Sequence, residues 1–224
     1  MWLAEFIFPT RCVACGSAGA LLCADCTRSL ARLGPPVCER CGAPTAWPVP
    51  TCRECGSHRI AFDSARAAIR YDAAGRRIVR AWKERGLRRF SIHAAELVAG
   101  RVPRPVADVI TYIPPDGDRS AKRGHHPAQS LAEALGERWG LPVDCLLART
   151  RPVARQAELR RAARRGNVRG AFAPARERVP ECIVLVDDVY TTGATVDAAA
   201  AALRKAGARE VRVVTFARVT RAVG

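Results

Sequence analysis

The fold is decided by one stretch of the chain, Ile183-Val184-Leu185-Val186-Asp187-Asp188-Val189-Tyr190-Thr191-Thr192-Gly193-Ala194-Thr195. Its first four residues are apolar and predict a short buried strand, which two adjacent acids follow directly. The small residues at 191–195 then predict a tight turn into a helix. Because open α/β sheets bind ligands at the carboxyl ends of their strands, this order predicts a binding site just after the strand.

The turn at 191–195 has the chemistry of a phosphate site. Backbone N–H groups, threonine hydroxyls and the amino end of a helix can together surround a phosphate monoester, and a glycine lets the ligand approach the main chain closely. The chain contains neither GxxxxGK[ST] nor GxGxxG, so nucleoside triphosphates and dinucleotides are not supported as ligands. The alternative is a solvated acidic turn before an ordinary helix. The expected phosphate-binding residues are Thr191, Thr192, Gly193, Ala194 and Thr195.

The acid pair suits another part of the same ligand. Asp187 and Asp188 offer acceptor oxygens for the 2′- and 3′-hydroxyls of a ribose, or for a magnesium ion held through its water shell. One sugar phosphate satisfies both the acids and the turn. A phosphorylated ribose is therefore the expected ligand class.

Elsewhere the chain alternates between strand-like and helix-like segments. Strands are expected at 65–71, 106–113, 183–186 and 211–216, and helices at 75–83, 92–98, 127–139 and 195–206. This alternation predicts an α/β fold with a mainly parallel sheet and helices on both faces. An arginine-dense connection at 149–169 is expected to be exposed, either as a hood that closes over the ligand or as a solvated basic loop.

The amino-terminal part of the chain is dominated by four CxxC pairs. Each pair can give two sulfurs to one tetrahedral ion, so four pairs predict two structural zinc sites, most simply by joining neighbouring pairs. A crossed order fits the spacing equally well, and iron, a redox dithiol or disulfides are the alternatives to zinc. The pairs are Cys12/Cys15, Cys23/Cys26, Cys38/Cys41 and Cys52/Cys55, whereas Cys145 and Cys182 stand alone and are expected to be small buried residues.

The change in composition near residue 60 predicts two units, a cysteine-rich double zinc ribbon at 1–60 and an α/β domain at 61–224. The ribbon would serve as structural support or would contact nucleic acid or protein. Residues 1–8 lack the basic start and cleavage site of a signal peptide, and no apolar run reaches membrane-spanning length. We therefore expect a cytoplasmic protein with no membrane insertion.

The charge of the chain favours phosphorylated or polyanionic partners. Its formal net charge is +16 and its pI is near 10.4. Aromatic residues make up only 6% of the chain, so it has no obvious base-stacking platform for sequence-specific recognition of nucleic acid.

At the acid pair and the threonine turn, the chain resembles the type I phosphoribosyltransferases, whose signature is an apolar strand, an acid pair and a Thr-Thr/Ser-Gly-x-Thr turn. With its cysteine-rich ribbon it is more narrowly similar to the ComF family of competence-associated proteins, also described as GntX-like. The likeness covers almost the whole chain. Its further matching segments are Ala81-Trp82-Lys83, Lys122-Arg123-Gly124, Arg155-Gln156 and Arg165-Gly166-Asn167-Val168-Arg169-Gly170-Ala171-Phe172.

The chain departs from the family pattern at one place. Similar proteins usually read Arg-Gly-Phe-Asn-Gln where this chain reads Arg123-Gly124-His125-His126-Pro127. The paired histidines would contact pyrophosphate or cap the following helix. They are not expected to bind a metal, because no third ligand is near in sequence.

The resemblance implies binding of phosphoribosyl pyrophosphate with Mg²⁺, with Asp187 and Asp188 at the catalytic centre and Lys83 and Arg155 toward the pyrophosphate. Catalysis of this kind is electrostatic, because Mg²⁺ and basic side chains neutralise the departing pyrophosphate while C1 of the ribose gains oxocarbenium character. The first hypothesis is an enzyme that moves a phosphoribosyl group to an unidentified acceptor. The second is an accessory protein of competence and DNA uptake that handles single-stranded DNA, with competence-machinery proteins as partners and a regulatory or vestigial sugar-phosphate pocket.

Overall fold

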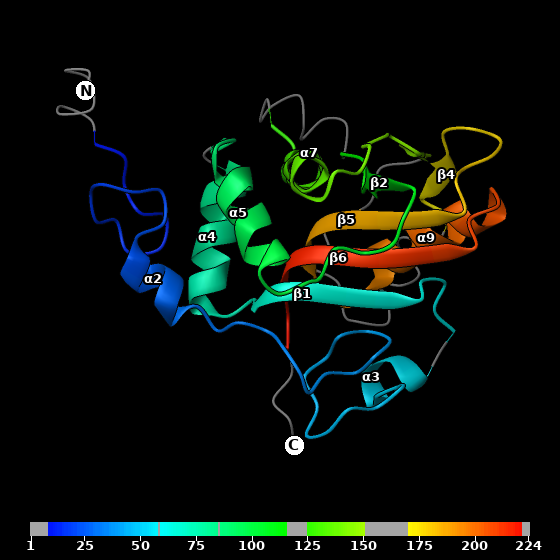
Figure 1. Ribbon diagram of the computed structural model, residues 1–224, viewed down its shortest axis with the longest axis horizontal. Coiled ribbons are helices and arrows are strands. Elements are labelled where there is room, and N and C mark those ends of the chain that lie inside the picture. Colours follow the sequence, from blue (N-terminus) through cyan, green and yellow to red (C-terminus); the bar gives the residue numbers. More distant parts are fainter. Residues whose placement is uncertain (1–8, 58, 85, 116–124, 151–169, 221–224) are drawn as a thin grey trace.

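The computed structural model describes residues 9–57, 59–84, 86–115, 125–150 and 170–220. Its centre is a four-stranded sheet in the order β1-β6-β5-β2, and every neighbouring pair is parallel. This confirms the expected parallel α/β sheet (Figure 1). The strands are β1 (Ser64–Arg70), β2 (Val109–Tyr112), β5 (Cys182–Tyr190) and β6 (Glu210–Arg218).

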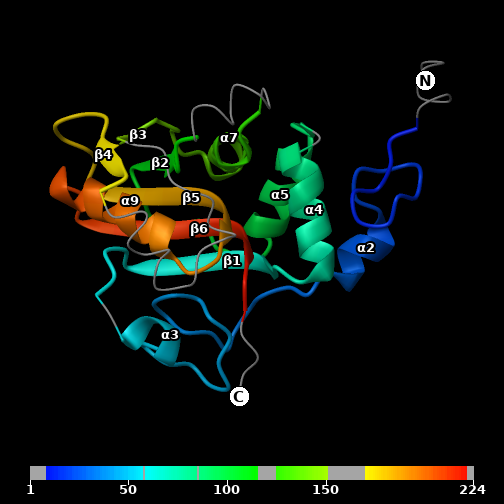
Figure 2. The same ribbon diagram turned by 180° about the vertical axis from the view of Figure 1, so that it is seen from behind.

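Helices cover both faces of the sheet, as expected (Figures 1 and 2). One face carries α4 (Ala73–Glu84), α5 (Phe90–Ala99) and α7 (Pro127–Trp139). The other face carries α9 (Ala194–Lys205) and a small antiparallel pair, β3 (Leu147–Arg149) with β4 (Phe172–Pro174). The bounds of α7 are those expected, and the bounds of α4, α5 and α9 differ from the expected ones by one or two residues at each end.

The two hydrophobic cores follow from the period of two along β5. Val184 and Val186 pack with α7 on one face, whereas Ile183 and Leu185 pack with α9 on the other. Because α7 follows β2 and α9 follows β5, the connections of two adjacent parallel strands leave to opposite faces. A crevice at the carboxyl ends of such strands is the usual ligand site of an open α/β sheet.

Three strands differ in length from the expected ones, and one of them, β6, extends beyond 211–216 at both ends. β5 does not stop at Val186 but continues through Tyr190, because β6 is equally long and pairs with it up to Tyr190 and Arg218. β2 begins at Val109 rather than at Val106, whose side chain is 78% exposed, because pairing with β5 starts only at Val109. The acid pair therefore lies within the strand and not after it.

The cysteine-rich segment contacts the α/β domain in two places (Figure 1). The short helix α2 (Ala24–Ser29) lies beside α4, and the neighbouring Leu22 and Leu30 belong to the core of that face. The helix α3 (Arg53–Gly56) lies next to the β1 edge of the sheet, where the N–H of Ala65 donates to the carbonyl of Arg40 at 2.7 Å. The linker between the ribbon and the sheet, which includes Ala61 and Asp63, forms hydrogen bonds with α9.

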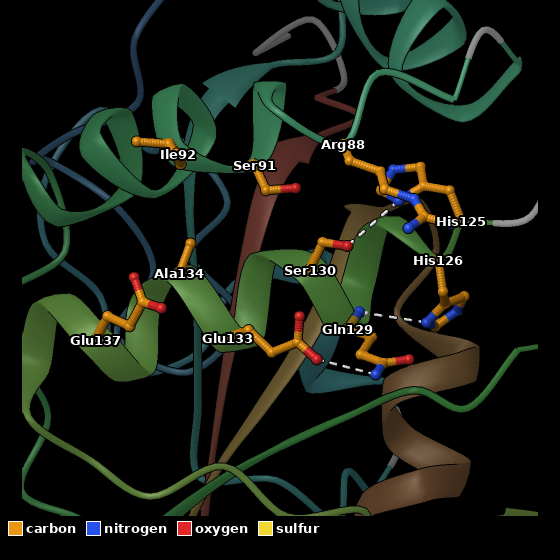
Figure 3. A pocket seen from close by; sticks show the side chains of 10 residues that line it. All are labelled: Arg88, Ser91, Ile92, His125, His126, Gln129, Ser130, Glu133, Ala134 and Glu137. Carbon is orange, nitrogen blue, oxygen red and sulfur yellow. Dashed lines mark hydrogen bonds between the residues drawn. The ribbon is translucent and has the colours of Figure 1, made fainter.

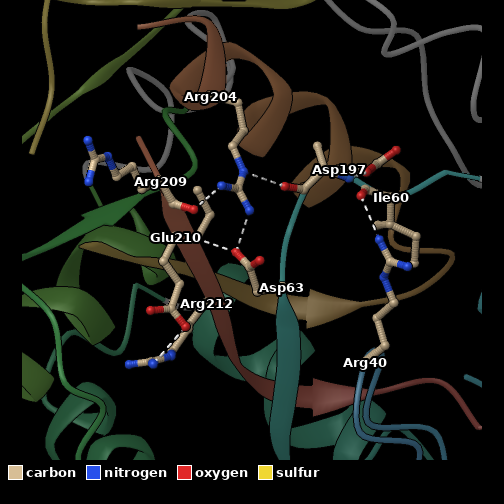
Figure 4. A network of polar contacts seen from close by, with 10 residues as sticks. Arg40, Ile60, Asp63, Asp197, Arg204, Arg209, Glu210 and Arg212 are labelled. Atoms are coloured by element: carbon tan, nitrogen blue, oxygen red, sulfur yellow. Dashed lines mark hydrogen bonds and ion pairs between the residues drawn. The ribbon is translucent and has the colours of Figure 1, made fainter. Parts of the chain in front are cut away.

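That link is a network of polar contacts (Figure 4). The N–H of Ala61 donates to the carboxylate of Asp197 at 2.7 Å, and the guanidinium of Arg204 donates to the carbonyl of Ala61 at 3.0 Å. Arg204 also pairs with Asp63 at 2.6 Å, and Asp63 accepts from the N–H of Val211 at 2.8 Å. The first turn of α9, its last turn and the start of β6 all hold this linker.

The two isolated cysteines correct a sequence prediction. Cys145 is exposed and Cys182 is half-buried, although both were expected to be buried. Cys145 lies in the connection between α7 and β3 and its thiol contacts the carbonyl of Leu147 at 3.5 Å, while Cys182 begins β5 at the end of the sheet. Their positions at the ends of elements leave them open to solvent.

Among the helices that the structure describes, none combines the length and the apolar character needed to cross a bilayer.

Candidate functional site

The eight paired cysteines form two clusters by joining neighbouring pairs. One cluster is Cys12, Cys15, Cys23 and Cys26, and the other is Cys38, Cys41, Cys52 and Cys55; in each, the sulfurs all lie within 4.8 Å of one another. The crossed order is therefore wrong, because it would join sulfurs of different clusters. The two groups of four thiols are those of two structural zinc sites.

The distances between sulfurs test whether zinc fits. Four sulfurs at a Zn–S distance of about 2.3 Å in a tetrahedron lie about 3.8 Å apart. The contact from Cys15 to Cys23 is 3.8 Å, and the contacts from Cys38 to Cys55 and from Cys41 to Cys52 are 3.6 and 3.5 Å. Crowding also resists loss of all four protons without a cation, since the neighbouring Cys23 and Cys15 thiols raise the pKa of Cys26 to about 12. A divalent ion relieves that repulsion, so the donor set fits zinc.

The acid pair meets the predicted lysine at the carboxyl end of β5. The Nζ of Lys83, near the end of α4, lies 2.6 Å from Oδ2 of Asp188. Asp188 is 13% exposed and Lys83 one-third exposed. The structure thus brings Lys83 of α4 to the acid pair Asp187 and Asp188 of β5, from which it is far apart in sequence.

The two acids differ in their electrostatics. Burial, together with the charge of Asp188, raises the pKa of Asp187 to about 7, and the Asp187 carboxylate accepts the N–H of Asp188 at 2.9 Å. Burial opposes the charge on Lys83, but the carboxylate of Asp188 outweighs it and the pKa of Lys83 is raised. Near neutral pH, Asp188 and Lys83 form an ion pair beside an Asp187 that is poised to titrate.

The threonine turn follows Tyr190 and begins α9. Gly193 is the residue before the helix, with φ at +77° and ψ at −4°. Thr192 Oγ1 contacts the N–H of Ala194 at 3.4 Å, and the first intrahelical bond runs from the N–H of Asp197 to the carbonyl of Gly193. The first turn of a helix offers N–H groups that no intrahelical carbonyl accepts, which is the arrangement that binds a phosphate.

The role of Gly193 differs in part from the expected one. A Cβ at this position would lie 2.2 Å from the hydroxyl oxygen of Tyr190 and 2.6 Å from its Cζ. The missing side chain therefore makes room for Tyr190, whereas the expected close approach of a ligand stays a prediction. The positive φ is a second reason for glycine.

The paired histidines have different partners (Figure 3). His126 precedes α7, and its Nδ1 accepts the N–H of Gln129 at 3.2 Å, so His126 caps the helix. Burial lowers the pKa of His126 to about 4, which keeps the ring neutral and able to accept. His125 Nδ1 lies 3.3 Å from the hydroxyl of Ser130.

The two histidines line a cavity of about 470 Å³ between α5 and α7. Figure 3 shows the polar side chains of α7 along its floor, where Gln129 donates to Glu133 at 2.9 Å. Arg88 lies at its upper end, beside His125. The charge of Asp188 raises the pKa of His126 against the larger effect of burial, so the acid pair acts electrostatically on one residue that lines the cavity.

Several predicted residues lie outside the described part of the chain. These are Arg155, the segment Lys122-Arg123-Gly124 and nearly all of the arginine-dense connection at 149–169. Arg149 itself is described, and its guanidinium donates to the carbonyl of Pro114 and lies over the ring of Phe172. Its charge reaches Asp187, whose pKa it lowers against the effects of burial and of Asp188.

Sequence reasoning missed two residues beside the turn. Tyr190 and Arg218 end the adjacent strands β5 and β6 and stack on one another, with the guanidinium carbon 4.1 Å from the ring centroid. Neither has a local sequence signal for this contact, because the pair depends on the register of strands that are 28 residues apart at this point.

The chain matches two families of known proteins. Residues 3–64 match the double zinc ribbon domain, and residues 59–222 match the phosphoribosyl transferase domain. It is 27% identical to the competence protein ComFC of Streptococcus pneumoniae over 88% of this chain and 87% of that protein. It is 25% identical to competence protein F of Haemophilus influenzae over 94% of this chain and 98% of that protein.

The chain belongs to the ComF family of phosphoribosyltransferase-like proteins. The ComF family resemblance drawn from the acid pair, the threonine turn and the ribbon is confirmed. Among solved structures, the allosteric regulatory enzyme of purine biosynthesis is 27% identical and superposes with a TM-score of 0.41, over 57% of this chain and 25% of that one.

Proposed function

We propose that this ComF-family chain binds phosphoribosyl pyrophosphate with Mg²⁺ at the carboxyl end of β5 and transfers its phosphoribosyl group to an acceptor. The observation that carries the proposal is the 2.6 Å contact from Lys83 to Asp188. Asp188 follows Asp187 directly in β5, and only the threonine turn separates the end of β5 from the start of α9. A cation, two carboxylates and a helix amino end are the groups that a phosphorylated ribose with a pyrophosphate would need.

Each group has a part in the proposed complex. The N–H groups and hydroxyls of Thr191, Thr192, Gly193, Ala194 and Thr195 would hold the 5-phosphate. Asp187 and Asp188 would accept from the ribose hydroxyls or hold the water shell of Mg²⁺, and Lys83 and Arg155 would bind the pyrophosphate. When bound, Mg²⁺ supplies charge that stabilises the pyrophosphate as it leaves C1.

The ion pair between Lys83 and Asp188 has a consequence for binding. A lysine that is paired in the unbound protein must turn from the carboxylate toward the pyrophosphate, so Asp188 becomes available to the ribose or the metal as the ligand enters. Lys83 would then stabilise the charge that develops on the leaving group, without any covalent bond to the protein.

Calorimetric titration with phosphoribosyl pyrophosphate and Mg²⁺ tests the proposal. We expect heat with the wild type and at least about tenfold weaker binding for Asp188→Asn, since hydrogen bonds to charged groups are worth about 1.5–3 kcal/mol. Asp144→Asn is the matched control, because Asp144 pairs with Arg176 on the surface at 2.7 Å. No heat with the wild type, or equal losses for both variants, would refute the proposed site.

A second function, handling of single-stranded DNA with competence proteins as partners, is favoured by a separate observation. The net charge is +16, and relatives are named competence proteins and, in Salmonella typhi, DNA utilization protein YhgH. Binding of an oligonucleotide should weaken at least about tenfold between 50 and 200 mM salt, because counterions are released on binding. Unchanged electrophoretic mobility of the oligonucleotide at low salt would exclude this function.

We also propose that the chain divides into a ribbon at 1–60 and a transferase-like domain at 61–224.

We further propose that the protein works in the cytoplasm. The eight clustered thiols support this location, because they bind zinc only where they stay reduced. Fractionation of cells with an antibody to the chain would test the location.

A further inference from the structure

Arg218, the last residue of β6, is a buried cation between the second cysteine cluster and the threonine turn. It is 1% exposed. One of its N–H groups donates to the carbonyl of Cys41 at 2.6 Å, and another lies 3.2 Å from the carboxylate of Glu54 and 3.6 Å from the sulfur of Cys41. A guanidinium this deeply buried is stable only where such partners surround it.

The same guanidinium contacts the turn through Tyr190. Its carbon lies 4.1 Å from the centroid of the Tyr190 ring, a distance at which a cation and an aromatic face attract. The hydroxyl of Tyr190 in turn fills the space that a side chain at Gly193 would occupy. A contiguous series of contacts therefore runs from the zinc ligand Cys41 through Arg218 and Tyr190 to Gly193.

A second and independent tie joins the same two parts of the molecule. The linker that leaves the second cluster donates from the N–H of Ala61 to Asp197, which lies in the first turn of α9 directly after the threonine turn. Figure 4 shows Asp63 and Asp197 on either side of the Arg204 guanidinium, and Ile60 next to Asp197, where its carbonyl accepts from Arg40. The second cluster is thus attached to both sides of the turn.

The charges of the site explain why a cation is needed at this point. A zinc ion with four thiolates carries a formal charge of about −2, and donors around the sulfurs stabilise that charge. Arg218 approaches the Cys41 sulfur from the side of the sheet. Loss of the metal would loosen the knuckle that holds the Cys41 carbonyl, and the buried guanidinium would lose partners.

We infer that Arg218 is a positioning residue that links the second zinc site to the threonine turn at 191–195. Zinc bound by Cys38, Cys41, Cys52 and Cys55 then favours the conformation of the turn that can bind a phosphate. Because such coupling is reciprocal, a ligand at the turn also slows loss of that zinc ion. The effect on the ligand rests on the proposed function. The effect of Arg218 on zinc and on the order of the turn does not.

The first cluster provides an internal control. It lies beside α4 and α5, on the other side of the ribbon from α3 and the β1 edge (Figures 1 and 2). Substitution of Arg218 should therefore leave the rate of zinc release from the first cluster unchanged. Both zinc sites are present in every variant, so each measurement compares them within one protein.

The test combines zinc release to a chromogenic chelator with hydrogen exchange of the full chain. For Arg218→Met we expect one of two zinc ions to bind about 10–100-fold more weakly, the usual cost of losing a group that supports a metal ligand, and to leave faster than it leaves the wild type. Exchange should rise in peptides covering 38–55 and 190–197 and stay unchanged in those covering 12–26. Arg218→Lys should recover part of both effects, because it keeps the charge but not the fork of donors.

Two further variants keep the outcome decisive. Arg212→Met is the matched control on β6, where Arg212 pairs with Glu210 at 2.6 Å near the surface, and it should match the wild type in both measurements. Glu54→Gln removes the negative charge that faces Arg218 and leaves the other partners of Arg218 in place, so it tests the link even if Arg218→Met does not fold. It should speed loss of the same zinc ion and raise exchange at 190–197 by a smaller factor.

Results from these variants separate this inference from the proposed function. The link is overturned if the Arg218 and Glu54 variants release zinc at the same rate as the wild type and show the same hydrogen exchange at 190–197. This holds whichever ligand the turn binds. Equal acceleration of both zinc ions also overturns it. If the variants behave as expected but phosphoribosyl pyrophosphate gives no heat with the wild type, the proposed ligand is wrong and the link stands.

Discussion

Replacing Gly193 with alanine would place a methyl group against the Tyr190 phenol in a backbone conformation that alanine avoids. The left-handed conformation costs a residue with a Cβ about 1–2 kcal/mol. The new Cβ would lie 2.2 Å from the Tyr190 hydroxyl, so the ring or the turn must shift, and overpacking of this kind costs about 1–3 kcal/mol. We therefore expect the free energy of unfolding to fall by about 2–5 kcal/mol.

Gly140, at the end of α7, separates the two contributions. Its φ is +62°, close to the +77° of Gly193, but a Cβ there would meet no atom within 4 Å. Gly140→Ala should therefore cost only the backbone part, about 1–2 kcal/mol. Urea unfolding followed by far-ultraviolet circular dichroism measures both variants. Equal losses for Gly193→Ala and Gly140→Ala would show that Tyr190 does not occupy the space beside the turn.

Three further perturbations test the site and its support. Burial and Asp188 raise the pKa of Asp187 from 3.8 to about 7, so its contribution to the stability of the unliganded fold should be full below about pH 4 and should be lost progressively as the pH rises to about 7. Ligand binding that needs the carboxylate should strengthen about tenfold from pH 6 to 8. Asp187→Asn should abolish both dependences, and their persistence in calorimetry and urea unfolding would contradict the assignment. Lys83→Met should weaken the binding of phosphoribosyl pyrophosphate at least about tenfold, and unchanged affinity would remove Lys83 from the site. Trp82→Ala should lower the free energy of unfolding by about 3–5 kcal/mol, since Trp82 is 0% exposed. Trp47→Ala should change thermal stability little, because the Trp47 side chain is 68% exposed. Similar losses for the two variants would argue against the core as described.

The fold was predictable because local patterns and tertiary structure agree over most of the chain. The apolar runs around Val184 and Val213 indicate buried parallel strands, and both lie at the centre of the sheet. The sequence could not show that β5 continues through Asp187 and Asp188. Adjacent acids read locally as the end of a strand, and only the equal length of β6 keeps them paired.

The site was predictable where one segment supplies it and less so where several segments meet. The acids, the threonine turn and the spacing of the cysteine pairs are local features. Lys83 was named by resemblance, and its contact with Asp188 depends on how α4 packs. The stack of Tyr190 on Arg218 depends on strand register and on the position of the ribbon, which no pattern within a single segment encodes.

The order of strands also affects how this protein can be assembled during synthesis. β6 comes after β1 and β5 in sequence and is the last strand that the structure describes, yet it lies between them and joins them by hydrogen bonds on both of its edges. The sheet cannot be completed while residues 210–218 of the nascent chain are still inside the ribosome. Truncation before residue 210 should therefore give a product that aggregates or is degraded, because β1 and β5 would both be left with open edges.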